Sequence, residues 1–235
     1  GSLGINQQAT NTGDYFSVQA RTILVPGMII PLRIKLFNAA GFTQWLEFSL
    51  SIGSVTVTDP LGPDMHGYLI YDDGDTAYAE HPVYNWLGIA PAEGGSGSAL
   101  NINDPEAPGE GDDIGSASVD TVTLPFDFVF YGKSYREITV SSNGFIVMGV
   151  TDNPEFRNYR LPGPMGPAPM IAAFWDDLAT GPESGVYTYY NEAEHSFIIE
   201  WYQMQNGFQN YYAETFQIIL YDPIFHPGTL GDGPI

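Results

Sequence analysis

The sequence has no cysteine and very few cationic side chains. Its 235 residues include only 7 Lys and Arg against 28 Asp and Glu, which gives a net charge of −21. The absence of Cys excludes disulfides, thiolate catalysis, and Cys-ligated zinc or iron–sulfur sites. Because so few cations cannot line a groove that follows phosphates, we expect no nucleic-acid partner. An anionic membrane surface is an equally poor partner.

Long apolar runs and helical periodicity are also missing. No run approaches the roughly 20 apolar residues of a membrane helix, so we expect no membrane insertion. No signal peptide is present, and we interpret Gly1-Ser2 as the scar of an expression tag. We read the sequence as a fragment of a longer polypeptide, so its lack of a signal peptide does not argue against secretion. Aromatic residues make up 14% of the chain, which argues against wholesale disorder.

The negative charge is concentrated in one part of the chain. Residues 66–124 hold eleven acidic residues and no Lys or Arg, whereas residues 1–65 hold four acidic residues and three cations. The acidic part is rich in Gly, Pro, Ser and Asp, a composition typical of loops. We therefore divide the chain into a leading β segment over 1–58, an acidic linker and insertion over 59–120, and a β module over 121–235.

The first 58 residues show strand periodicity broken by turn residues. Alternation over 15–25 ends at Pro26-Gly27, and alternation resumes over 28–37 with apolar residues on one face. Further alternation over 46–50 and over 55–58 completes about four short strands. This pattern predicts an immunoglobulin-like sandwich segment.

The second half shows the same periodicity more strongly. Strands are expected over 122–132, 135–140, 145–150, 170–175, 186–190, 197–202 and 215–221. Pro125 interrupts the first of these strands and favours a sheet edge or a bulge. Asn143-Gly144 predicts a hairpin with a type I′ turn. The chain is therefore predicted to be all-β, with the leading segment followed by a larger, jelly-roll-like antiparallel β-sandwich.

Several motifs of the second half together resemble a known family. They are Leu124-Pro125-Phe126, Ser142-Asn143-Gly144, the run 170–178 with its Phe-Trp-Asp-Asp-Leu sequence, and the strands near 185–190, 197–201 and 215–221. In this order they resemble the nidogen-like β domain of extracellular adhesion proteins. They are also similar to an accessory module of large secreted bacterial proteins, several of which carry a gingipain-type cysteine peptidase domain and type IX secretion signals.

This resemblance implies a non-catalytic function. We expect an accessory or adhesion module of a bacterial protein, located outside the cell or on its surface. Its partners would be other domains of the same polypeptide, an extracellular protein or a glycan. Since the chain has no Cys nucleophile, the peptidase activity of the family's larger members does not carry over.

Clustered acidic residues are candidate ligands for Ca²⁺, a hard cation that binds six to eight oxygens. The alternative for each cluster is a hydrated loop or turn without a metal. The candidates lie around Gly74, in the acidic insertion beside Asn103 and Glu110, and after Trp175; they are Asp72, Asp73, Asp75, Asp104, Glu106, Asp112, Asp113, Asp176 and Asp177.

Late aromatic residues leave a second function open. Tyr189, Trp201, Tyr211 and Tyr212 lie near several Gln and Asn residues, and exposed aromatic rings can stack on sugars. The chain would then be a carbohydrate-binding module, unless these rings are core residues as alternating strand aromatics often are. A third possibility is a glycoside hydrolase that uses Asp176 with Glu200, which requires two carboxylates about 5–10 Å apart.

Overall fold

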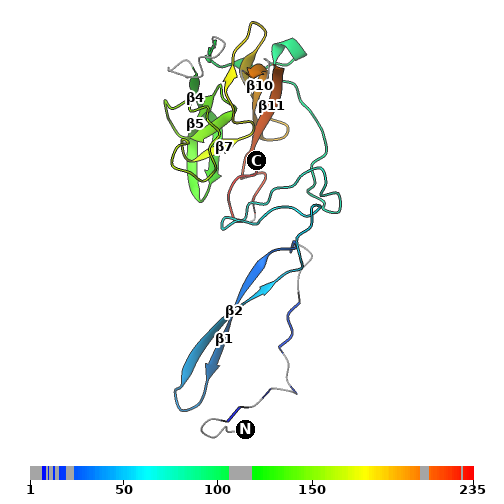
Figure 1. Cartoon of the computed structure of the whole chain (residues 1–235), viewed down its shortest axis with the longest axis vertical. Coiled ribbons are helices and arrows are strands. Elements are labelled where there is room, and N and C mark those ends of the chain that lie inside the picture. The colour runs from blue at the N-terminus through cyan, green and yellow to red at the C-terminus, as the bar shows by residue number, and fades with distance from the viewer. Residues whose placement is uncertain are drawn as a thin grey trace. The chain divides into compact units, whose positions relative to one another are not determined.

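The computed structural model describes residues 7, 8, 10, 13, 16–19, 24–105, 118–206, 212–228 and 230–235. Its regular structure is antiparallel β-strand apart from one short 3-10 turn, η1 (Pro91–Glu93), so the all-β class is confirmed (Figure 1). No helix in these residues is long and apolar enough to span a lipid bilayer. The chain divides into two compact units, the first comprising Gly1–Asp64 and Tyr68–Val83, and the second Met65–Gly67 and Tyr84–Ile235.

The first unit contains one β-hairpin. Strand β1 (Ile29–Phe37) pairs with β2 (Thr43–Ser51), and Asn38 closes the turn by accepting hydrogen bonds from the main chain of Ala40 and Phe42, both at 3.0 Å. The register places Leu32 opposite Phe48 and Ile34 opposite Leu46. Directly opposed residues share one face of a sheet, so the hairpin has one apolar face, as its alternation predicts.

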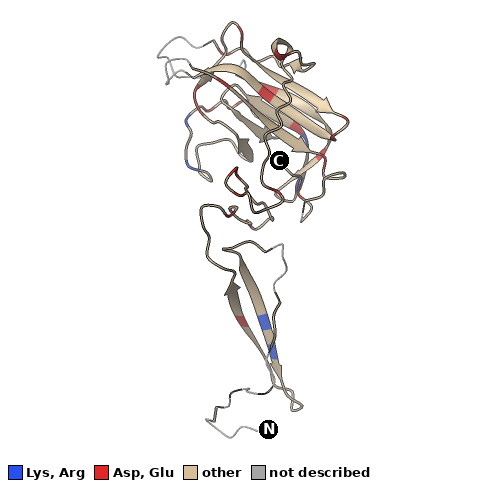
Figure 2. Ribbon diagram, turned by 90° about the vertical axis from the view of Figure 1, so that its right-hand side faces the viewer, with Lys and Arg blue, Asp and Glu red and all other residues tan. Residues whose placement is uncertain are grey.

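The opposite face of the hairpin mixes polar with aromatic and aliphatic residues and carries both of its cations. Arg33 lies 3.2 Å from Glu47 and 4.6 Å from the ring of Trp45, and Lys35 lies above the same ring. In Figure 2 the cationic positions of the hairpin, in blue, lie on one strand and its acidic position, in red, on the other. Every residue of β2 is exposed. A two-stranded hairpin is marginally stable on its own, and the apolar side chains of β2 remain exposed in the described structure.

The strands of the leading segment differ from those expected for an immunoglobulin-like sandwich. Residues 55–58 form no strand. The chain turns over 56–59 instead, where Thr56 donates two hydrogen bonds to Asp59, from its main-chain nitrogen and its hydroxyl. A strand is also expected over 15–25, and the described residues of that range lie outside regular structure. Within the described residues the leading segment therefore has two of its four expected strands.

The second unit consists of two antiparallel sheets. One has the strand order β4-β5-β6-β7, and the other has the order β11-β10-β9-β3, with β8 also paired to β10. Their strands are β3 (Ser98–Ala99), β4 (Val119–Phe130), β5 (Lys133–Ser141), β6 (Phe145–Met148), β7 (Met170–Ala172), β8 (Leu178–Ala179), β9 (Gly185–Asn191), β10 (Ser196–Asn206) and β11 (Tyr212–Tyr221). All seven strands predicted for this half form.

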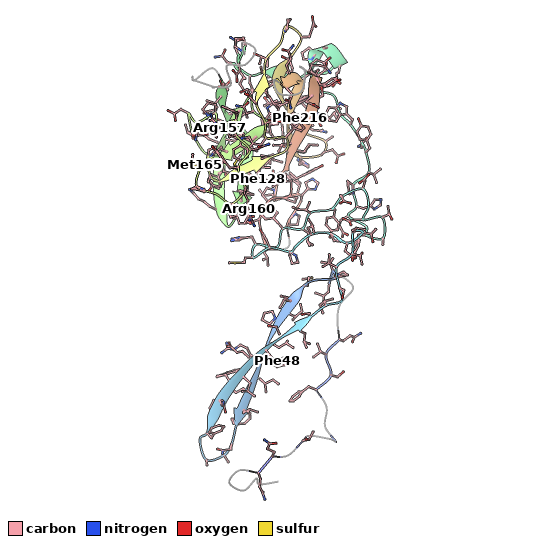
Figure 3. All side chains as sticks on the ribbon, in the orientation of Figure 1. Phe48, Phe128, Arg157, Arg160, Met165 and Phe216 are labelled. Atoms are coloured by element: carbon pink, nitrogen blue, oxygen red, sulfur yellow. The ribbon has the colours of Figure 1, made fainter. Side chains whose placement is uncertain are left out.

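The core lies between the two sheets. Strand β4 alternates buried Leu124, Phe126, Phe128 and Phe130 with less buried residues, as expected for a strand with one face in a core. Across the interface, Phe126 approaches Tyr190 of β9 at 6.2 Å. The indole nitrogen of the fully buried Trp201 donates to the main-chain oxygen of Ser141 at 2.7 Å. Figure 3 labels Phe128 and Phe216 within this sandwich and Phe48 on the separate hairpin.

Two local predictions in the second unit have different outcomes. Strand β4 lies at a sheet edge and its register shifts between Thr123 and Phe128, as Pro125 predicts. Asn143-Gly144 does turn the chain between β5 and β6, but only Gly144 has positive φ, at 74°, so the turn is not type I′. Asn143 is instead fully buried, and its side chain is used in the core.

Candidate functional site

Glu200 is a completely buried carboxylate that holds the loop 86–97 against the sheet. Its two oxygens accept hydrogen bonds from the main-chain nitrogens of Ile89 at 2.9 Å and Ala90 at 3.1 Å. Gln217 of β11 donates to the same carboxylate at 2.6 Å and to the main-chain oxygen of Leu87 at 2.7 Å. Burial of a charge is costly unless it is hydrogen-bonded, so these donors explain how Glu200 is tolerated there.

The register of the sheet shows on which of its two faces the side chain of Glu200 lies. Tyr187, Glu200 and Gln217 lie opposite one another across β9, β10 and β11, and the neighbouring row is Tyr189, Ile198 and Ile219. Trp201 lies on the other face, toward the sandwich core. The loop 86–97 therefore covers the outer face of this sheet and buries β10 on both sides.

Glycines make the tight path of this loop possible. A Cβ on Gly95 would lie 2.3 Å from the main chain of Ile89, and one on Gly97 would lie 2.7 Å from the oxygen of Ile89. These contacts are shorter than any side chain allows, and they accompany a hydrogen bond from the Gly97 nitrogen to that oxygen at 2.8 Å. The Gly-rich 94–97 stretch is thus a packed loop on the sheet.

An open cavity of about 390 Å³ lies between this loop and the end of β9. Its lining combines an aromatic ring, polar side chains, apolar side chains and glycine main chain, from Leu87, Gly88, Ile89, Gly94, Gly95, Ser96, Tyr189 and Asn191. Asn191 is oriented by hydrogen bonds from the nitrogens of Ala193 at 3.2 Å and Glu194 at 3.4 Å to its Oδ1. The volume is near the lower end of the range of about 300–1,000 Å³ for small-molecule sites, but the cavity is open to solvent rather than enclosed, so a ligand here would stay partly exposed.

The aromatic residues proposed as ligand contacts do not form one platform. Trp201 is a core residue, fully buried and stacked on Phe216 at 5.0 Å, which corrects its assignment as a ligand contact. Tyr189 lines the cavity, and Tyr212 is 67% exposed. These two pair with Ile198 and Asn206 of β10, eight residues and roughly 26 Å apart along the strand. Tyr211 lies outside the described residues.

Asp104 belongs to a polar group that connects the two sheets. Its Oδ2 accepts a hydrogen bond from the Ser142 hydroxyl at 2.6 Å, and its main chain exchanges hydrogen bonds with Thr180. The adjacent Asn143 donates to the oxygen of Pro154 at 2.7 Å and accepts from the nitrogen of Leu178 at 2.8 Å. The Ser-Asn-Gly motif is thus a buried junction of loops.

The acidic pair after Trp175 has a structural environment as well. Asp176 accepts hydrogen bonds from the Asp177 nitrogen at 2.9 Å and from Asn206 at 3.1 Å, and Asp177 is 2% exposed. A glycosidase needs two carboxylates that face a shared cleft. Glu200 instead lies under the loop 86–97 with its oxygens bound to main-chain donors, which disfavours the Asp176–Glu200 pair.

The acidic turn at Gly74 contains one exceptional carboxylate. Asp72 and Asp73 are exposed, whereas Asp75 is 2% exposed. The Oδ2 of Asp75 accepts a hydrogen bond from the Asp72 nitrogen at 2.9 Å, but its buried Oδ1 has no hydrogen-bond partner. Within the described ranges, no three His, Cys, Asp or Glu side chains are grouped to hold a metal. Glu106, Asp112 and Asp113, with the neighbouring Glu110, lie outside those ranges.

A short hydrogen bond next to this turn shifts two pKa values. The Tyr78 hydroxyl donates to Asp59 at 2.5 Å. This bond, followed by bonds from Thr56, lowers the pKa of Asp59 below its usual value. The same bond raises the pKa of Tyr78 to about 12. The nearby Tyr71 has its pKa raised by burial first and then by the negative charges of Glu80 and Asp75.

Comparison with known proteins identifies the family. A family model described as NIDO related matches residues 100–223, which is more than half of the chain. The chain belongs to the NIDO-related family. Comparison with curated proteins and with solved structures gave no match. The match includes every strand from β4 to β11, so the nidogen-like resemblance of the second unit is confirmed.

Sequence reasoning did not find the main parts of this site. Leu87, Ser96 and Asn191 belong to no motif, and the sequence suggests for Glu200 only a catalytic pairing with Asp176. The run of Gly94, Gly95 and Gly97 was a usable signal, because closely spaced glycines indicate close approach of two main chains. Their contact, Ile89, could not be identified without the fold.

Proposed function

We propose that this chain is a non-catalytic accessory and adhesion module of a secreted or cell-surface bacterial protein. The observation that carries the proposal is the NIDO-related match over residues 100–223. The environment of Glu200 supports it, because a carboxylate that accepts three hydrogen bonds beneath a packed loop has a structural role. Its partners are other domains of the same polypeptide and extracellular proteins or glycans, in a larger protein of the gingipain-containing, type IX-secreted kind.

Two measurements on the full chain test this function. Beads coated with the chain should retain bacterial or host cells above the level of albumin-coated beads, and equal retention would contradict adhesion. A screen of polysaccharides should show no turnover. Turnover by the unchanged chain that Asp176→Asn abolishes would establish the hydrolase instead.

We also propose that Ca²⁺ stabilises the first unit at the turn Asp72–Asp75. The buried Oδ1 of Asp75 lacks a donor, and a cation would compensate that desolvated charge. Residues 66–124 supply no Lys or Arg that could do so. With few carboxylates at hand, main-chain oxygens and water would complete the coordination, as they commonly do for Ca²⁺.

A further inference from the structure

We propose that the cavity between the loop 86–97 and the end of β9 binds a neutral saccharide. This inference rests on the proposed function and names a ligand class for its glycan-binding aspect. Of the residues that carry it, Tyr189 and Asn191 lie within the family match and Ser96 lies before it. Its central residues are Tyr189, Asn191 and Ser96, which lie together on the lining of the 390 Å³ cavity.

Hydrogen bonds hold the cavity wall in place, and those of Glu200 are buried. Glu200 fixes Ile89 and Ala90, Gln217 fixes Leu87, and the nitrogen of Gly95 donates to the oxygen of Ala90 at 3.0 Å. A site that is rigid before binding loses less conformational entropy when a ligand enters. The buried charge of Glu200 therefore has a consequence beyond stability, since it sets the shape of one cavity wall.

The chemistry of the lining fits a sugar ring. Tyr189 lies on the lining, and the ring of a tyrosine is a surface against which the C–H face of a pyranose can pack. The Oδ1 of Asn191 is used by the turn 191–194, which directs the amide nitrogen as the donating end, and the exposed Ser96 offers a hydroxyl. A few placed polar groups beside apolar walls are the usual composition of a small-molecule site.

The charge around the cavity favours a neutral ligand. No Lys or Arg is among its lining residues, and Glu93 of the same loop lies beside Gly88 and accepts a hydrogen bond from Trp86 at 3.4 Å. In a chain of net charge −21, an anionic sugar would enter against an unfavourable potential. Uronic and sialic acids should therefore bind worse than neutral sugars of similar size.

An extended peptide fits this place less well than a compact ligand. Strand β3 pairs with Tyr187 and Thr188, so only Tyr189–Asn191 of β9 extend beyond it before the turn at Glu192 begins. Three residues of edge offer too short a ladder for the addition of a strand, and the loop already lies across them.

The test is a titration followed by amide NMR shifts of the full chain. The probes are cellotetraose, chitotetraose and mannotetraose at up to about 10 mM, with tetragalacturonate as the anionic comparator and a tetrapeptide mixture as the peptide comparator. We expect at least one neutral tetrasaccharide to shift the amides of Ser96 and Asn191, with tetragalacturonate at least about tenfold weaker.

Matched variants locate the binding. Tyr189→Ala should weaken binding about tenfold or more, and Asn191→Asp, which keeps the turn acceptor but loses the donor, should weaken it severalfold. Tyr212→Ala is the control, because it removes an exposed ring of β11 that lies opposite the far end of β10, and it should leave affinity unchanged. If Tyr189→Ala does not fold, Ser96→Tyr should block the cavity from an exposed position.

Several results would overturn the proposal. They are the absence of cavity shifts with all three neutral sugars, loss of binding in Tyr212→Ala but not in Tyr189→Ala, or shifts produced by the peptides alone. Failure here is separable from failure of the proposed function, since cell retention by coated beads can persist without any sugar in this cavity.

Discussion

At the scale of single residues, burial decides which of the many acidic side chains matter. Asp72, Asp73 and Asp75 are near neighbours in sequence, yet only Asp75 is buried with an unpartnered oxygen. Exposed carboxylates are hydrated and contribute little to stability. A buried one must be compensated, so Asp75 is the residue on which the calcium proposal depends.

Removal of Ca²⁺ should destabilise the first unit. EDTA is expected to lower its melting temperature, because an ion that binds the folded state stabilises it by about 2.7 kcal/mol at a hundred times its dissociation constant. Asp75→Asn should abolish the response to Ca²⁺, whereas Asp152→Asn, an exposed carboxylate elsewhere, should keep it. Differential scanning calorimetry measures both. An unchanged curve with no metal in elemental analysis would refute the site.

The Tyr78–Asp59 bond predicts a dependence of stability on pH. The pKa of Asp59 is lowered in the folded chain. Its ionised carboxylate therefore stabilises the fold fully above the ordinary pKa of 3.8, and this stabilisation is lost as the pH falls through the lowered pKa of the folded chain. Tyr78→Phe should raise the pKa of Asp59 and reduce the loss of stability at low pH. Carbon NMR of the Asp59 carboxyl measures it, and an identical titration in both proteins would contradict the bond.

The same bond has an alkaline counterpart. Because the pKa of Tyr78 is raised to about 12, the stability from its protonated form is complete below the ordinary value of 10.0 and is lost as pH rises toward 12. Ultraviolet titration should show one tyrosine ionising late, and Asp59→Asn should move it earlier. Titration of that tyrosine near 10 in the unchanged chain would contradict this prediction.

At the scale of elements, a loop and a sheet depend on one another through Glu200. Sequence periodicity predicts β9, β10 and β11, and Pro125 correctly predicts the edge position and irregularity of β4. Periodicity does not predict the docking of the loop 86–97 on β10, because this docking depends on contacts between residues more than a hundred positions apart. No local pattern encodes such a contact.

Glu200→Gln should loosen the loop and lower stability. The amide group would present N–H toward one of the main-chain donors, and hydrogen bonds to a charged group are worth about 1.5–3 kcal/mol each. We expect a loss of about 2–4 kcal/mol in urea denaturation of the second unit. Hydrogen exchange at Ile89 and Ala90 should accelerate most, and Glu192→Gln, in an exposed turn, should leave both quantities unchanged.

At the scale of the whole molecule, the hairpin and the sandwich bury aromatic residues to very different extents. Phe128 is fully buried in the second unit, whereas Phe48 of β2 is 42% exposed (Figure 3). Both lie in alternating apolar positions that look alike in sequence. The difference arises because the sandwich has a second sheet over its apolar face, while the described part of the first unit has none over the hairpin.

Two alanine substitutions should expose this difference. Phe128→Ala is expected to destabilise the second unit by about 3–5 kcal/mol, since it removes a buried ring and leaves a cavity. Phe48→Ala should leave the unfolding of the second unit unchanged. Denaturation of both variants, followed by tryptophan fluorescence, measures the effects, and a loss of second-unit stability in Phe48→Ala would show that the ring has a buried role.

The sequence by itself determined the all-β class, nine of the eleven strands of the described residues and the nidogen-like resemblance, because alternation and turn residues are local properties of the chain, whereas the two-residue strands β3 and β8 are too short to show alternation. The tertiary structure decided the rest. It buried Trp201 instead of exposing it, used Asn143 as a core junction, and assembled a cavity from Leu87, Ser96 and Asn191. Burial and hydrogen-bond partners depend on segments that meet only on folding, so no count of charges or aromatic rings could have assigned them.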